Sequence, residues 1–219
     1  MHAPNNTSLL EHNGWTLRIR EAIETPTRLL LMIHGWTGDE NSMWVFARNF
    51  PANVMIVAPR GLHVSPQGGF SWRPHREGTF GRPSLADLVD SARRLLTLVD
   101  EMQARAGMEA GLFDVMGFSQ GAAMSNVMAC LYPGRVRKAG ILAGFMPSGM
   151  EQIVAQKPLA GKPMFVTHGT QDTLVPIDRG RASMSLLEQA GAHVTYCEAE
   201  VGHKVSSECM RALEVFFRI

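Results

Sequence analysis

The chain has 219 residues, 45% of them hydrophobic, so it is long enough for one large folded domain and short for two. Its 21 lysines and arginines nearly cancel its 20 aspartates and glutamates, which argues against a nucleic-acid or anionic-membrane binder, because both classes depend on excess positive charge. We therefore expect a single domain over residues 1–219 whose ligand is a small neutral molecule.

The cysteines and the N-terminal segment bear on the cellular compartment. Cys130, Cys197 and Cys209 are odd in number, lack metal-type spacing and lie in apolar segments, so we expect small core residues in a reducing compartment. Residues 1–14 are polar and contain no apolar stretch typical of a signal peptide. No later stretch approaches the length that spans a bilayer. These features predict a cytoplasmic protein without a membrane span.

Several segments have the hydrophobic patterns of strands. Residues 17–20 alternate apolar and basic side chains, which predicts an edge strand with one wet face. Residues 29–33 and 54–58 are continuously apolar, which is typical of strands buried on both faces. Residues 41–49 could form a short helix between them. Further strands are expected at 112–116, 139–143, 164–167 and 193–198, with helices at 84–106, 119–132, 176–190 and 205–217.

This alternation of strands and helices predicts a mostly parallel sheet with helices on both faces, the α/β class. The interval between 143 and 164 is too short for a cap domain, so we expect an open pocket covered by loops. Residues 60–83 form the least regular stretch, and loops of that length in compact domains are usually functional or disordered. Because this stretch carries Phe70, Trp72 and Phe80, we favour a functional loop.

The motif Gly117-Phe118-Ser119-Gln120-Gly121 stands between a predicted strand and a predicted helix. A strand that reverses into a helix so sharply leaves no room for side chains two residues from its tip, which explains both glycines. Ser119 would then project above the sheet edge as a nucleophile. The backbone N–H of Gln120 would lie at a helix N-terminus, where a developing negative charge is stabilised.

A serine hydroxyl needs a base, and the imidazole needs a carboxylate that holds its tautomer. His203 follows the strand at 193–198 and can reach the carboxyl edge of the sheet. Asp172, after the strand at 164–167, is the best placed acid, and the chain order Ser119, Asp172, His203 is that of α/β-hydrolases. His168 and Asp178 are the alternatives: we expect a packing or hydrogen-bonding role for the first, and a helix-dipole role for the second.

The remaining histidines offer no better base. His34 lies beside the glycine-containing loop at 35–38 and is expected to be structural, while His63 and His75 could only line a pocket. There is no His-Glu-x-x-His motif and no clustered Cys/His spacing. We therefore expect neither a metal nor another cofactor.

Five segments together resemble the phospholipase/carboxylesterase family, which includes acyl-protein thioesterases. They are Ile33-His34-Gly35-Trp36, the motif around Ser119, Leu142-Ala143-Gly144-Phe145-Met146-Pro147, His168-Gly169-Thr170-Gln171-Asp172-Thr173-Leu174-Val175-Pro176 and Gly202-His203. The resemblance implies an α/β-hydrolase fold with Ser119 as nucleophile, Asp172 and His203 as its partners, and the backbone amides of Trp36 and Gln120 as the oxyanion hole. The sequence departs from the family pattern at Ala122, where glycine is common, and at Trp36, where leucine is common.

On this basis we expect a serine hydrolase that cleaves short to medium acyl esters through an acyl-enzyme. Trp36, Phe70, Trp72 and Met146 are the expected lining of an apolar acyl pocket. Three alternatives stay open: an acyl-protein thioesterase or lysophospholipase, a peptidase-type α/β-hydrolase, and a non-catalytic binding protein with this fold. Family members are often dimers, so a homodimer is an alternative to a monomer.

Overall fold

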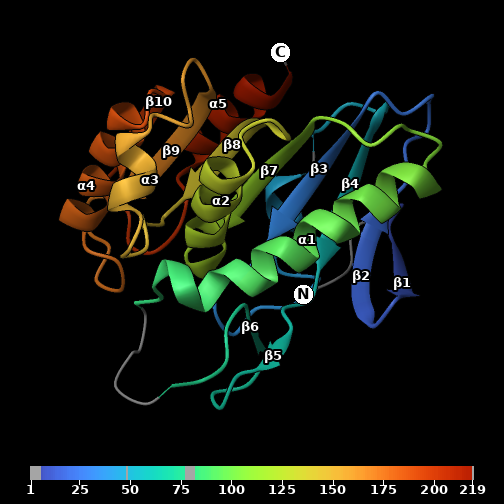
Figure 1. Cartoon of the computed structure of the whole chain (residues 1–219), viewed down its shortest axis with the longest axis horizontal. Helices are drawn as coiled ribbons and strands as arrows, with labels where there is room; N and C mark the ends of the chain where they lie inside the picture. Colours follow the sequence, from blue (N-terminus) through green and yellow to red (C-terminus); the bar gives the residue numbers. More distant parts are fainter. Residues whose placement is uncertain (1–5, 48, 77–81, 219) are drawn as a thin grey trace.

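A computed structural model describes residues 6–47, 49–76 and 82–218, and within these ranges the chain forms one eight-stranded sheet with helices packed on it (Figure 1). The strand order is β1-β2-β4-β3-β7-β8-β9-β10. In chain order these strands are β1 (Ser8–His12), β2 (Trp15–Arg20), β3 (Arg28–Ile33), β4 (Val54–Pro59), β7 (Phe113–Phe118), β8 (Val136–Leu142), β9 (Pro163–Gly169) and β10 (His193–Ala199).

The pairing from β4 to β10 is parallel throughout, whereas β2 is antiparallel to both β1 and β4. The predicted mostly parallel sheet is therefore confirmed. The prediction that residues 17–20 form an edge strand is wrong, because β1 pairs along the outer side of β2. The wet face was predicted correctly, since the side chains of β2 alternate between buried and partly exposed.

Helices cover both faces of the sheet, as Figure 1 shows. One face packs against α1 (Leu85–Arg105), α2 (Gln120–Leu131), α3 (Glu151–Ala155) and α4 (Ile177–Gln189), and the other against α5 (Ser207–Arg218). Strand β3 contributes to both cores, because Leu29, Leu31 and Ile33 point to one side and Leu30 and Met32 to the other. The sheet is thus buried on both faces at its centre.

The long helix α1 starts and ends where its sequence predicts. The Ser84 hydroxyl accepts from the backbone N–H of Asp87, while the Asp87 carboxylate accepts from the backbone N–H of Ser84, which is a reciprocal capping box. Leu88, Leu95 and Met102 recur every seven residues and are fully buried. This helix therefore lies across the sheet with one apolar stripe facing inward.

Two predicted segments differ from the structure. Within the described part of the segment 41–49, the structure has a 3₁₀ turn, η1 (Trp44–Phe46), in place of the expected helix. The irregular stretch 60–83 contains a small hairpin of β5 (His63–Val64) and β6 (Phe70–Ser71). Of the aromatic residues predicted to be functional there, Phe80 lies outside the described residues.

The cysteine prediction is wrong for two of the three residues. Cys197 on β10 and Cys209 on α5 form a disulfide across a sequence separation of 12 residues, whereas Cys130 is a free, buried thiol. Disulfides are rare in reducing compartments, so the cysteines no longer support a reducing compartment for this protein. In the described part of the chain no helix is long and apolar enough to cross a membrane.

Candidate active site

Ser119 occupies a strained turn between β7 and α2. Its backbone has φ 55° and ψ −114°, a region that L-residues seldom adopt, and its N–H donates to the carbonyl of Leu142 at 2.9 Å. The flanking glycines make the turn sterically possible. A Cβ on Gly117 would lie 2.0 Å from the carbonyl oxygen of Gly121, and a Cβ on Gly121 would lie 2.0 Å from that of Ile33. The turn has the geometry of a nucleophile elbow.

His203 and Asp172 are joined by a short hydrogen bond. His203 Nδ1 donates to Asp172 Oδ2 at 2.6 Å, and the side chain of Asp172 is fully buried. The other carboxylate oxygen accepts from the backbone N–H groups of Leu174 and Val175, both at 2.9 Å. This arrangement holds the imidazole in the tautomer whose Nε2 can accept a proton.

The two alternatives have other roles, although His168 Nε2 lies 3.5 Å from Asp172 Oδ2. His168 is buried, and its Nε2 donates to the carbonyl of Val175 at 2.8 Å, so it has the hydrogen-bonding role expected from the sequence. Its Nδ1 faces Gly180, where an added Cβ would lie 2.4 Å away. Asp178 is exposed in the first turn of α4, where the helix dipole stabilises its charge.

His34 supports the loop 35–38 that follows β3. Its Nδ1 donates to the carbonyl of Gly35 at 2.7 Å, while its Nε2 accepts the backbone N–H of Gly61 at 2.8 Å. Burial lowers the pKa of His34 to about 4, so the ring is neutral near pH 7 and one nitrogen stays available as an acceptor. The predicted structural role of His34 follows from these bonds.

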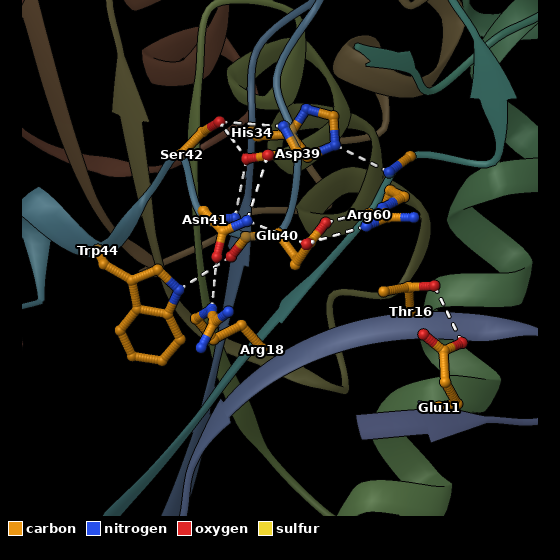
Figure 2. A network of polar contacts seen from close by, with 11 residues as sticks. Glu11, Thr16, Arg18, His34, Asp39, Glu40, Asn41, Ser42, Trp44 and Arg60 are labelled. Carbon is orange, nitrogen blue, oxygen red and sulfur yellow. Dashed lines mark hydrogen bonds and ion pairs between the residues drawn. The ribbon is translucent and has the colours of Figure 1, made fainter. Parts of the chain in front are cut away.

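A polar network extends this support to neighbouring residues (Figure 2). Glu40 is 4% exposed and accepts two hydrogen bonds from the guanidinium of Arg60, at 2.8 and 3.0 Å. Burial opposes the ionisation of Glu40, but the hydrogen bonds and the charge of Arg60 outweigh it, so the pKa of Glu40 lies below its usual value. Asp39 accepts the backbone N–H of Asn41 and the hydroxyl of Ser42, both at 2.9 Å. The loop 35–42 is therefore anchored to the residue that follows β4.

Gln120 ties the elbow to the hairpin. Its side-chain oxygen accepts the backbone N–H of Trp72 at 3.0 Å, and its amide nitrogen lies 3.2 Å from the hydroxyl of Ser71. Its own backbone N–H is the first of α2, and such amides have no acceptor within their helix. The side chain thus fixes a residue that lines the cavity.

A cavity of about 1080 Å³ lies at the carboxyl edge of the sheet. Ser119, His203, Trp36 and Gln120 all line it, and Asp172 lies behind His203. The rings of Phe118 and His203 have centroids 4.9 Å apart, so the residue before Ser119 packs on the imidazole. The folding of the chain brings these residues, distant in sequence, to one place.

Three residues expected in the acyl pocket lie elsewhere, which corrects that part of the expectation. Trp72 is fully buried and donates from Nε1 to the carbonyl of His34 at 2.8 Å. Phe70 lies outside the cavity, and the guanidinium carbon of Arg60 is 4.7 Å from the centroid of the Phe70 ring. Met146 is 9% exposed and packs in the core. Only Trp36 of the four expected residues lines the cavity.

Most apolar residues of the cavity wall were missed in the sequence. They come from the segment around η1, from the end of β8 and from the start of α5, where no single pattern marks them: Met43, Val45, Phe46, Phe145, Val205 and Met210. Of these six, Phe145 belongs to a family-like motif, as do the apolar lining residues Phe118, Leu174 and Val175.

A comparison with known protein families identifies the family of this chain. The family model described as Phospholipase/Carboxylesterase matches residues 16–219. The chain belongs to this family. Its members are hydrolases, and the resemblance inferred from the sequence is thereby confirmed.

Relatives of this chain include proteins named carboxylesterase and acyl-protein thioesterase. It is 27% identical over 139 residues to carboxylesterase SOBER1 of Arabidopsis thaliana, covering 61% of this chain and 59% of that protein, so the match spans less than two thirds of the plant enzyme. It is 31% identical over 176 residues to acyl-protein thioesterase 1 of Yarrowia lipolytica, covering 74% of this chain and 76% of that protein. The crystal structure of a carboxylesterase from Mesorhizobium loti superposes with a TM-score of 0.82 at 22% identity, covering 97% and 99% of the two chains. That last similarity concerns the fold, and it confirms the α/β-hydrolase class.

Proposed function

We propose that this hydrolase cleaves carboxylic esters of short to medium acyl chains, with Ser119 as nucleophile, His203 as general base and Asp172 as the acid that orients the base. The observation that carries the proposal is the 2.6 Å hydrogen bond between His203 and Asp172 behind a cavity that Ser119 also lines. The strained backbone of Ser119 supports it, because strain of this kind persists where a side chain must be presented.

In this mechanism the hydroxyl of Ser119 attacks the acyl carbonyl while Nε2 of His203 accepts its proton. The backbone N–H groups of Trp36 and Gln120 stabilise the oxyanion, and His203 returns the proton to the leaving alcohol. Water then attacks the acyl-enzyme with His203 again as base, which releases the acid and restores Ser119. Asp172 stays ionised and stabilises the imidazolium in both halves.

A fluorophosphonate probe and an ester series test this proposal. We expect wild type to be labelled at Ser119, and Ser119→Ala to lose labelling and about 10⁶-fold in kcat. Ser125, buried within α2, supplies a matched serine-to-alanine control that keeps both properties. Persistent turnover in Ser119→Ala would exclude Ser119 as nucleophile, and absence of labelling and turnover in wild type would favour the non-catalytic alternative.

Acyl thioesters are the second candidate substrates. Relatives in Yarrowia lipolytica and Debaryomyces hansenii are both named acyl-protein thioesterase 1, and the matches cover 76% and 82% of those proteins. The same residues would serve, because the acyl-enzyme is identical and only the leaving group changes. Matched oxygen esters and thioesters of one acyl series compare the two, and aminoacyl amides test the peptidase alternative.

Three further expectations belong to this proposal. We propose that residues 1–219 act as one catalytic domain, that the protein is cytoplasmic, and that a homodimer is the alternative to a monomer. The disulfide between Cys197 and Cys209 opposes the second of these, since it favours an oxidising environment. Subcellular fractionation tests the location, and sedimentation equilibrium tests the oligomeric state.

A further inference from the structure

The cavity wall has a charge balance unlike that of the whole chain. Lysine and arginine nearly equal aspartate and glutamate overall, at 21 against 20. Among the described residues that line the cavity, by contrast, no aspartate or glutamate occurs. The basic side chains there are Arg73, His75, Arg82, Arg179, His203 and Lys204. An expectation of a neutral ligand, drawn from overall charge, therefore does not apply locally.

Arg179 is the basic residue whose position relative to the elbow is best defined. It stands in the first turn of α4, and its guanidinium carbon lies 4.0 Å from the centroid of the Phe145 ring. Phe145 is held in turn by Asn126, whose Nδ2 donates to its carbonyl at 3.1 Å. The preceding Gly144 packs on the elbow, because an added Cβ there would lie 3.3 Å from the carbonyl oxygen of Ser119. These contacts connect Arg179 to the nucleophile turn through Phe145 and Gly144, and Arg179 and Ser119 line the same cavity.

Other positive charges lie near Arg179. Burial, followed by the charge of Arg82, lowers the pKa of Arg179, and both residues line the cavity. Arg73 is 6% exposed and also lines the cavity. An anionic ligand in the cavity can accept N–H hydrogen bonds from guanidinium groups that line it.

Other parts of the wall are hydrocarbon. Val45 and Phe46 come from the segment after the loop 35–38, and Val205 and Met210 come from the segment after His203. A ligand that fills both parts must carry an apolar chain and an anionic group.

We propose that the natural substrate is an ester with an anionic group, a carboxylate or a phosphate, that binds Arg179 and Arg82 while its hydrocarbon part lies against Phe46 and Met210. This inference rests on the proposed ester hydrolysis and specifies its substrate class. Arg179 is a binding residue in this account, and the charge-assisted hydrogen bonds it donates provide the selectivity.

Matched pairs of esters test the proposal. The first pair, monomethyl adipate and methyl hexanoate, tests a carboxylate on the acyl side. The second pair, carboxymethyl hexanoate and ethyl hexanoate, tests a carboxylate on the alcohol side. The third pair, 2-(hexanoyloxy)ethyl phosphate and ethyl hexanoate, tests a phosphate on the alcohol side. We expect wild type to favour at least one anionic ester over its neutral partner in kcat/KM. Arg179→Gln should reduce that preference by about 10- to 100-fold, and Arg179→Lys should restore part of it.

Arg181 supplies the matched control. It lies two positions further along α4, is exposed, and is paired with Glu198 at 2.8 Å outside the cavity. Arg181→Gln should keep the preference, and thermal melting checks that each variant folds. Equal or poorer hydrolysis of all anionic esters by wild type, or an unchanged preference in folded Arg179→Gln, would overturn the proposal. Hydrolysis of neutral esters reports on the proposed function separately, because failure there too would implicate Ser119 rather than Arg179.

Discussion

His203 Nδ1 donates to Asp172 Oδ2 at 2.6 Å, although the two residues lie on loops after different strands, β10 and β9. These strands are neighbours and parallel, so their carboxyl ends meet at one edge of the sheet. The bond determines which imidazole nitrogen is free, and the first prediction depends on it.

Asp172→Asn should abolish most activity without unfolding the protein. An amide can donate to Nδ1 and so favour the wrong tautomer, which in comparable triads lowers kcat about 10⁴-fold. Steady-state kinetics with a neutral ester measures the loss, and thermal melting checks the fold. Asp178→Asn removes the exposed rival acid on α4 and should keep nearly full activity. Equal losses in both variants would contradict the assignment of Asp172.

Gly69→Ala should disturb the loop 35–38 and lower kcat. Gly69 has φ +65°, and an added Cβ would lie 2.0 Å from the carbonyl oxygen of Thr37, next to the Trp36 amide. Displacing one oxyanion donor costs up to about 10²-fold in kcat. Gly68 offers a matched control, because it has φ +88° but open space around its Cα. Gly68→Ala should lose about 1 kcal/mol of stability and little kcat; a similar kcat in the two variants would argue against this role of Gly69.

Reduction of the disulfide between Cys197 and Cys209 should destabilise the native state by about 3 kcal/mol, because the bond closes a loop between residues 12 positions apart in the sequence. That loop contains His203, so kcat should fall as well. Urea denaturation with and without dithiothreitol measures the first effect. The double variant Cys197→Ala/Cys209→Ala should not respond to reductant. Titration of three thiols rather than one in unreduced, denatured wild type would show that the bond does not form.

His34 should make stability depend on pH between about 6.5 and 4. Its pKa is about 4 in the native state, where burial disfavours the charged ring, and about 6.5 when unfolded. The unfolded chain therefore binds a proton that the native chain does not, and stability present above pH 6.5 is lost as the pH falls toward 4, by about 3 kcal/mol. Urea denaturation of wild type and His34→Gln at pH 7 and pH 5 should give a smaller pH effect in the variant. His193→Gln, at an exposed position on β10, should retain the wild-type effect.

The sequence by itself determined the class of fold and the order of most elements. Continuous apolar runs report burial directly, since they occur where both faces of a strand are covered. The glycines around Ser119 likewise predicted the elbow, because a turn so tight restricts its own residues. Local patterns were sufficient wherever the constraint was local.

Only the tertiary structure decided which residues line the cavity and which cysteines pair. Trp72 and Phe70 are aromatic residues of the kind that line substrate pockets. However, a hydrogen bond holds Trp72 outside the cavity, and a contact with Arg60 holds Phe70 outside it. Cys197 and Cys209 meet because α5 packs beside β10. The basic wall around Arg179 arises in the same way, from segments brought together by the parallel sheet. These features depend on contacts between distant segments, which the periodicity of one segment does not encode.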